Sequence, residues 1–496
     1  YGHSMGNGPG DLEDYFQLIQ DHDIMSGGFV WEWCDHAVYA GKSRNGKSRY
    51  LYGGDHGETI HDSNFCMDGL VYPDRTPHTG LLEYKNVHRP ARALSYDPAA
   101  KELKLHNYLD FTDLKDYASV CYEVTCDGVC IDAGNVPAVS VKPHGEAAAA
   151  LDLTIPEAGK TYLKLTYRLL NESPLVPEGH VLGFDEILLE NEDGRNQTAV
   201  RWLEQKISPG ASVKVTETDC EIILDCKDFT YTYNKKNGLF KSICYGGREY
   251  LDSPMELNIW RAPTDNDMYI KTEWKKAHFH EACTRAYKTT VDESGESIVI
   301  ISTMSISAAS VQRILDIRAV WTIDNNGGIK ASLNIVKDDE FPALPRFGIR
   351  LFLPKELENV SYYGYGPCES YHDKHRASSH GLYSAKIREL HEDYIRPQEN
   401  GSHFDCDYVK LSSGRFGIAA VSEHTFSFHA SVYSQEELEK KAHNYELEES
   451  GSSILCLDYA QNGIGSNSCG PEVLSKYCFN DTRFCFEFKL IPFMIP

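Results

Sequence analysis

The chain has 496 residues, of which 41% are hydrophobic and 25% are charged, and its formal net charge is −24. This composition is typical of a globular protein with about three domains, not of a disordered chain. The negative charge argues against nucleic acid and membrane surfaces as partners, because both attract basic faces. No run reaches the ~18 apolar residues that span a bilayer, and the first residues lack the features of a signal peptide.

The 15 cysteines are an odd number scattered over the whole length. We interpret them as buried, reduced thiols of a cytoplasmic protein, because most stand in apolar, strand-like runs. Cys121, Cys126 and Cys130 cluster, but a zinc site normally needs closer pairs and a second half. Metal binding there stays open as the alternative.

Residues 1 to about 87 begin with an α/β pattern. Residues 11–25 carry apolar side chains at helical spacing, with Asp11 as the expected N-cap. The next run, GGFVWEW, is short and apolar, which predicts a buried strand. A helix followed by a buried strand indicates an α/β fold.

Residues 34–85 form a long segment with little periodicity, rich in Gly, His, Asp and Tyr. A segment of this length without regular structure is usually functional. We therefore expect it to contribute to a binding site. Its aromatic and histidine residues are Tyr52, His56, His61, Phe65, Tyr72 and His78.

From about residue 87 onward, apolar and polar residues alternate, which predicts half-buried strands. Residues 90–205 have the size of one β-sandwich, and 207–212 are a turn-rich linker candidate. Residues 213–496 are too many for a second sandwich of that size and predict one large β domain. A single helix is expected at 435–445, where Ser434 and Glu437 form a capping box.

The first candidate functional residues are His3, Trp31 and Trp33. A sugar site usually offers an aromatic face to the ring and polar groups to its hydroxyls. The alternative is that both tryptophans belong to the core. Glu32 lies between them and, on a strand, would point away from both, so we expect it outside the pocket.

Asp68 is the second candidate, because a carboxylate beside backbone carbonyls can hold a hard cation or a sugar hydroxyl. The alternative is a turn aspartate before Gly69. The run WRAPTDND at 260–267 predicts a structural turn. Residues 362–375 and 394–403 suit loops that reach a neighbouring domain or a ligand. No pair of carboxylates stands out as the catalytic pair of a glycosidase.

Eight motifs together resemble the large bacterial β-galactosidases of glycoside hydrolase family 2, in the family's order and spacing. They are YGHSMGNGPGDLEDY, GGFVWEWCDH, YGGDHGE, FCMDGLVYPDRTPH, WRAPTDND, GYGPCESYHDKH, RPQENGS and NGIGSNSCGP. The resemblance covers essentially the whole chain. It implies a mainly β fold: the end of a (β/α)₈ barrel at 1–87, an immunoglobulin-like β-sandwich at 88–206, and a large C-terminal β-sandwich at 213–496.

The resemblance also implies site residues. His3 matches the galactose-binding histidine, and Trp31 matches the tryptophan that lines the galactose pocket. Phe65, through its backbone carbonyl, and Asp68 match positions around a sodium ion that meets the sugar's 6-hydroxyl. Cys469 stands where some members place a tryptophan that stacks on glucose, so a preference for lactose is in doubt.

No catalytic residue is assigned to this chain. In the family, a nucleophilic glutamate directly precedes the residue that matches Tyr1, and the acid/base glutamate and the Mg²⁺ ligands lie further upstream. The resemblance therefore implies an N-terminal part of the same enzyme as partner, a β-galactoside as substrate and a homo-oligomeric parent enzyme. We expect the chain to be inactive by itself.

Two other functions stay open at this point. The chain can be a non-catalytic, sugar-binding or accessory subunit that complements a separate barrel-bearing chain. It can also be a stand-alone β-sandwich lectin, although residues 1–87 argue against this because they resemble barrel material.

Overall fold

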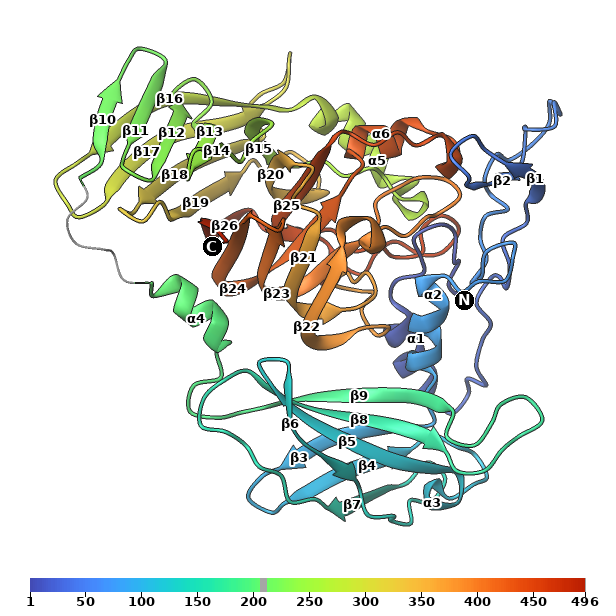
Figure 1. The fold of residues 1–496 in the computed structure, drawn as a ribbon. Helices are drawn as coiled ribbons and strands as arrows, with labels where there is room; N and C mark the ends of the chain where they lie inside the picture. Colours follow the sequence, from blue (N-terminus) through green and yellow to red (C-terminus); the bar gives the residue numbers. More distant parts are fainter. Residues whose placement is uncertain (206–211, 496) are drawn as a thin grey trace.

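The computed structural model describes residues 1–205 and 212–495, and their regular structure is mainly β, as expected. Figure 1 shows an N-terminal segment in blue, a smaller set of packed strands in blue-green and a large β domain coloured from green to red. The predicted linker lies, except for residue 212, outside the described residues. Across the described ranges, no helix has the length and apolar character needed to cross a membrane.

The N-terminal segment has little regular structure. Its elements are α1 (Leu12–Gln20), β1 (Val38–Lys42), β2 (Ser48–Leu51) and α2 (Thr79–Val87). Leu12 and Phe16 of α1 pack on Val87 of α2. Helix α1 is shorter than expected, because its last turn has no basic residue and Asp21 follows directly, which the helix dipole disfavours.

The prediction of a buried strand at GGFVWEW is wrong. Trp31 forms one isolated parallel bridge with His3, and Phe29, Trp31 and Trp33 are 89%, 61% and 59% exposed. A buried parallel strand needs neighbours at both edges and cover on both faces. Within the described residues, this run makes only scattered backbone hydrogen bonds at its two edges, to residues 2–4 and 68–71, and its aromatic side chains have no cover. The tryptophans are therefore not core residues.

The smaller set of strands is a two-sheet sandwich with strand orders β3-β4-β7 and β6-β5-β8-β9. Leu103, Leu163 and Leu165 are among its fully buried core residues. Its elements are β3 (Ala91–Asp97), β4 (Glu102–Asn107), α3 (Leu114–Tyr117), β5 (Ala118–Cys126), β6 (Val129–Asn135), β7 (Glu146–Ala150), β8 (Thr161–Leu169) and β9 (Val181–Leu189), followed by α4 (Gln197–Leu203).

A buried carboxylate ties this sandwich to the N-terminal segment. Asp185 of β9 forms an ion pair with Arg89, which follows α2. Asp185 also accepts hydrogen bonds from the Tyr167 hydroxyl, at 2.5 Å, and from the Ala93 N–H, at 2.7 Å. The contact fixes the segment that carries His3 and Asp68 against one end of the sandwich.

The large domain contains a five-stranded sheet, β10 to β14, and a twelve-stranded sheet, β15 to β26. The strands of the first are β10 (Lys214–Glu217), β11 (Glu221–Asp225), β12 (Phe229–Asn234), β13 (Leu239–Tyr245) and β14 (Arg248–Glu249). Those of the second are β15 (Ser253–Asn258), β16 (Cys283–Asp292), β17 (Ile298–Ser307), β18 (Leu315–Ile323), β19 (Ile329–Lys337), β20 (Arg346–Pro354), β21 (Asn359–Gly366), β22 (Ser379–Lys386), β23 (Ser402–Ser412), β24 (Phe416–Ser431), β25 (Ser452–Gln461) and β26 (Arg483–Met494).

The two α-helices of the large domain are short. Helix α6 (Gln435–Lys440) begins where predicted, and the Ser434 hydroxyl accepts the Glu437 N–H. It ends five residues early, and a 3₁₀ turn, Asn444–Glu446, follows. Helix α5 (Ile270–Lys276) was not predicted from the sequence, and its Trp274 is fully buried. The domain boundaries at residues 87 and 206 stay predictions.

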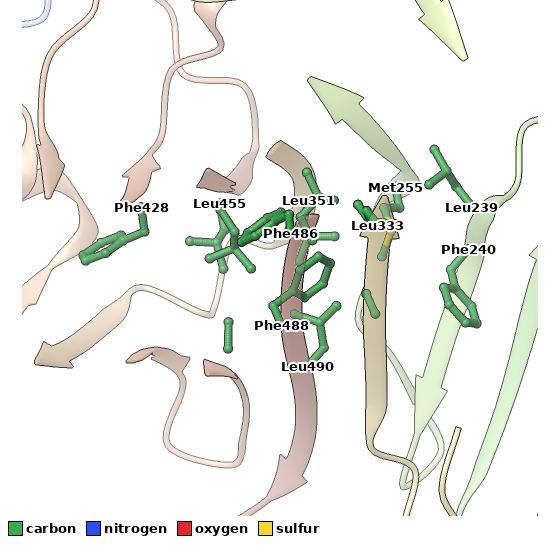
Figure 2. Close-up of a cluster of buried hydrophobic side chains, with 14 of the residues drawn as sticks. Leu239, Phe240, Met255, Leu333, Leu351, Phe428, Leu455, Phe486, Phe488 and Leu490 are labelled. Carbon is green, nitrogen blue, oxygen red and sulfur yellow. The ribbon is translucent and has the colours of Figure 1, made fainter. Parts of the chain in front are cut away.

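Alternation along the strands builds the large core. In β26, Phe486, Phe488 and Leu490 are buried, and Figure 2 shows them among leucines and aromatic rings from neighbouring strands. Cys485 faces the opposite side and is exposed. The same geometry explains why the prediction of buried cysteines is only partly right: all 15 are free thiols, but only Cys34, Cys406 and Cys456 are buried.

The three clustered cysteines lie on the paired strands β5 and β6. The thiol of Cys121 donates to Asn135 Oδ1 at 3.3 Å, that of Cys126 to the Ala158 carbonyl at 3.5 Å, and that of Cys130 to the Asp132 carbonyl at 3.5 Å. In the part of the chain that the structure describes, no group of three His, Cys, Asp or Glu residues is arranged for a metal ion.

Candidate functional site

Two of the predicted site residues contact the carboxylate of a third, Asp68. His3 Nε2 lies 3.4 Å from Asp68 Oδ2, and the Trp31 indole Nε1 donates to the same oxygen at 3.1 Å. His3 and Asp68 are buried, whereas the Trp31 side chain is largely exposed. The arrangement presents an aromatic surface beside a fixed polar pair, which is what a sugar ring and its hydroxyls require.

Short backbone contacts hold this carboxylate in place. The Ser4 hydroxyl donates to the Asp68 carbonyl at 2.5 Å, and the Glu32 N–H donates to the same carbonyl at 2.7 Å. Asp35 Oδ1 accepts the N–H of Gly69 at 2.8 Å. A Cβ at Gly69 would lie 2.1 Å from the Asp35 nitrogen, so only glycine fits at this position.

The second oxygen of Asp68 is buried and has no hydrogen-bond partner. An unpaired buried carboxylate oxygen is costly, and a cation or a ligand hydroxyl would satisfy it. The Phe65 ring lies 5.3 Å from the His3 ring, centroid to centroid, so Phe65 and Asp68, the two residues predicted for sodium, are both neighbours of His3. The donors are oxygens, which suit a hard cation.

The prediction that Glu32 points away from the pocket is wrong. Burial raises the pKa of Glu32, and the negative charge of the neighbouring Asp68 raises it further. Glu32 Oε1 also lies 3.4 Å from His36 Nδ1. The expectation assumed the strict alternation of a strand, and this run does not form one.

The large domain supplies one wall of the site. The Ser468 hydroxyl lies 3.0 Å from His3 Nδ1, and the Ser468 N–H donates to Asn266 Oδ1 at 3.3 Å. Cys469, the next residue, is exposed. The chain thus brings Cys469 next to a residue that contacts His3, although 465 positions separate His3 from Ser468 in the sequence.

A buried lysine joins the N-terminal segment to the large domain. Lys374 Nζ donates to Asn7 Oδ1 at 2.8 Å and to Glu369 Oε1 at 3.1 Å. Asn7 in turn donates to the Glu399 carbonyl at 2.8 Å. Lys374 and Glu399 belong to the two loops at 362–375 and 394–403, so these loops reach the N-terminal segment.

The run WRAPTDND is a turn, as predicted, and it also supports the site. Thr264 and Asp267 form a capping box, and Asp267 pairs with the buried Arg261. Asp265 Oδ1 accepts a hydrogen bond from Asn64 at 2.9 Å. The sequence did not predict the roles of Asn7, Lys374 and Ser468 at the site, or the supporting role of this turn. All of them stand inside the quoted motifs, but pairings across hundreds of residues cannot be deduced from one sequence.

Comparison with known proteins gives a consistent result along the chain. The family model "Glycosyl hydrolases family 2, TIM barrel domain" matches residues 1–92, "Beta-galactosidase, domain 4" matches 103–190, and "Beta galactosidase small chain" matches 225–490.

The curated relatives agree with the family models. The chain is 42% identical to a β-galactosidase of Actinobacillus pleuropneumoniae, over 99% of this chain and 47% of the relative. It is 36% identical to a β-galactosidase of Staphylococcus xylosus, over 99% of this chain and 48% of the relative. A β-galactosidase of Kluyveromyces lactis is 29% identical, over 99% of this chain and 46% of the relative. The chain thus spans about half the length of the curated relatives it matches.

Proposed function

The chain belongs to the β-galactosidase small-chain family, whose model matches residues 225–490, and we propose that it supplies the galactose-binding part of an enzyme that hydrolyses terminal β-D-galactosides. The observation that carries the proposal is the convergence of His3 and Trp31 on Asp68 Oδ2. The buried polar pair would orient the sugar hydroxyls, and the exposed indole face would contact the apolar side of the ring.

The catalytic carboxylates belong to a different part of the enzyme in this proposal. A retaining glycosidase needs two carboxyl groups about 5 Å apart, one on each side of the scissile bond. At this site, Glu32 and Asp68 are neighbours, and burial together with the charge of Asp68 raises the pKa of Glu32. Asp68 is also occupied by His3 and Trp31. This pair therefore does not have the geometry of a nucleophile facing an acid.

We also propose a sodium ion at the unpaired oxygen of Asp68, with the Phe65 carbonyl as a second ligand. The support is the buried, unsatisfied Asp68 Oδ1 and the oxygen donors that a hard cation prefers. A magnesium ion would be held by residues outside this chain.

The partner in this proposal is the other part of the same enzyme, and exposed apolar side chains support it. Ile24, Phe29 and Ile60 are among the most exposed large hydrophobic residues, and all three stand in the N-terminal segment with Trp31 and Trp33. So many strongly exposed large apolar side chains in one segment are unusual for a free surface and suit one that another protein part covers. An accessory subunit that complements a barrel-bearing chain would need the same surface.

The thiol of Cys469 offers a local test of sugar binding. Cys469 is exposed and adjacent to Ser468, which contacts His3, whereas Cys485 is exposed on β26. A bound nitrophenyl β-galactoside should slow alkylation of Cys469, measured peptide by peptide, and leave Cys485 unchanged. Asp68→Ala should remove the protection, and Asp116→Ala, at an exposed position in the sandwich, should keep it. Equal labelling of Cys469 with and without the galactoside would refute the proposed site.

A further inference from the structure

A second cavity lies in the large domain, lined by β15, the beginning of β16 and the beginning of α6, and has a volume of about 310 Å³. None of its lining residues belongs to the site around His3 and Asp68. This volume falls within the range of about 300–1,000 Å³ that small-molecule sites occupy.

The floor of the cavity is apolar and rigid. Leu239, Met255, Phe279 and Ile306 line it and are almost completely buried. Leu239 and Met255 lie at one edge of the apolar cluster in Figure 2. Because these side chains are part of the main core, the cavity has a fixed shape.

The polar wall is built from buried side chains. Asn258, Gln435 and Arg350 are only 5%, 8% and 9% exposed. The side-chain amides of Asn258 and Gln435 lie 3.1 and 3.2 Å apart, and a half-turn of the Gln435 amide also lets it donate to the Trp260 carbonyl, at 2.8 Å, and accept from Arg350 Nη1, at 3.1 Å. Arg350 donates twice to Glu256 Oε2, at 2.9 and 2.7 Å, and once to Glu436 Oε1, at 2.7 Å.

The charges of this wall exclude an anionic ligand. Two carboxylates face the one guanidinium, so the wall has an excess of negative charge and no free cation to hold an anion. A carboxylate offers about four acceptor positions, and Arg350 uses only one oxygen each of Glu256 and Glu436. The remaining acceptors and the amide pair suit a molecule rich in hydroxyl groups.

Two rings complete the cavity. Trp260 and His280 lie with centroids 5.6 Å apart at an interplanar angle of 48°. The Trp260 Nε1 donates to Glu439 at 3.0 Å, which fixes the indole. Aromatic rings beside amides and carboxylates are the combination that binds the C–H face and the hydroxyls of a sugar. Trp260 is the first residue of the motif WRAPTDND, whose other residues support the site around His3 and Asp68.

We propose that this cavity binds a neutral monosaccharide, at a saccharide site separate from the one around His3 and Asp68. The amides of Asn258 and Gln435 and the carboxylates of Glu256 and Glu436 take the hydroxyls, and His280, whose side chain is 30% exposed beside the buried Trp260, contacts the ring. The site is independent of the galactosidase function proposed above.

Cys283 is a reporter for this cavity, because it lines the cavity and is exposed. The experiment measures peptide-resolved alkylation of Cys283 in the purified chain during titration with galactose and with glucose. At least one of the two sugars should slow the labelling of Cys283 in a saturable way. Asp68→Ala should keep this protection, which separates the second site from the first.

Two variants test the polar wall. Gln435→Leu removes one buried amide, and Glu436→Gln, at a largely exposed side chain, replaces one of the two proposed carboxylate acceptors and weakens its ion pair with Arg350. Loss of one or two buried hydrogen bonds should weaken binding by about tenfold or more, with the circular dichroism spectrum unchanged. No protection of Cys283 by either sugar would overturn the proposal. It would also be overturned if Asp68→Ala abolished the protection, or if both wall variants bound as tightly as the original chain.

Discussion

At the residue scale, the site around His3 and Asp68 depends on one carboxylate with two different oxygens. Oδ2 is occupied by His3 and Trp31, whereas Oδ1 is buried without a partner. A buried polar atom without a partner costs about 1–3 kcal/mol. Such a cost is tolerated at sites where a ligand satisfies the group, and the sodium ion proposed above would be such a ligand.

Sodium removal should therefore weaken galactoside binding. When NaCl is replaced by choline chloride at equal ionic strength, we expect weaker protection of Cys469 by a galactoside, because Asp68 Oδ1 then lacks its counter-ion. In Asp68→Ala, the two salts should give the same result. If the original chain binds equally well in both salts, the sodium proposal is wrong.

Another residue-scale prediction concerns the buried guanidinium of Arg346, which pairs with Asp458 and lies 3.2 Å from Glu399 Oε2. Arg346→Ala leaves two buried carboxylates uncompensated and should lower the free energy of unfolding by about 3–5 kcal/mol. Arg388→Ala is the control, because Arg388 pairs with Glu449 at the surface and should cost at most about 1 kcal/mol. Urea unfolding measures both, and equal losses would contradict the argument.

At the element scale, alternation predicted the strands well and the N-terminal segment poorly. The run FCFEFKL became the core strand β26 because its period of two matches one buried face. The run GGFVWEW has the composition of a strand but no neighbouring strands within the described residues. Short apolar runs carry no information about which segments will pair with them, so the exposure of Trp31 and the position of Glu32 could not be predicted.

Strand β26 provides an element-scale prediction with an internal control. Phe486→Ala removes a buried ring from the large core and should cost about 3–5 kcal/mol of unfolding free energy. Cys485→Ala, one residue earlier on the exposed face, should change stability by at most about 0.5 kcal/mol. Denaturant unfolding of the two variants tests the facing of the strand, and a larger loss in Cys485→Ala would show that the facing is reversed.

At the scale of the whole molecule, one histidine joins the sandwich to the large domain. His380 of β22 lies 2.8 Å from Glu186 of β9 through Nδ1 and 2.8 Å from Asp405 of β23 through Nε2. Its ring also stacks on Tyr162 of β8 and lies 3.9 Å from the Tyr365 ring. Burial alone would lower the pKa of His380, but the two carboxylates outweigh burial and raise it.

The contacts of His380 with Glu186 and Asp405 should make the stability of the folded chain depend on pH. Because the pKa of His380 is higher in the folded chain than its usual value of 6.5, its contribution is complete below about pH 6.5 and is lost as the pH rises through the folded-state pKa. His380→Gln should remove this alkaline loss. Thermal unfolding of both proteins at a series of pH values from 6 upward is the measurement. Identical pH profiles would show that His380 does not carry the effect.

The proposed galactosidase function also concerns the whole molecule, because residues from both ends of the chain form the proposed site. Motifs in the sequence identified His3, Trp31 and Asp68, and the structure places these three together. Their assignment to galactose and sodium stays a prediction. The supporting contacts from Lys374 and Ser468 could not be foreseen, since they depend on how the large domain docks on the N-terminal segment.

The most direct test is the release of nitrophenol from a nitrophenyl β-galactoside by the purified chain, with and without a chain that carries the rest of the barrel. We predict no turnover by residues 1–496 alone, because among the described residues Glu32 and Asp68 are the carboxylates at the site and they are neighbours, not a separated pair, and general acid–base catalysis alone contributes about 10²–10⁴-fold. Turnover should appear when the second chain is added, and Asp68→Ala should weaken it. Turnover by the lone chain at the same rate as the mixture, unchanged after further purification, would contradict the account.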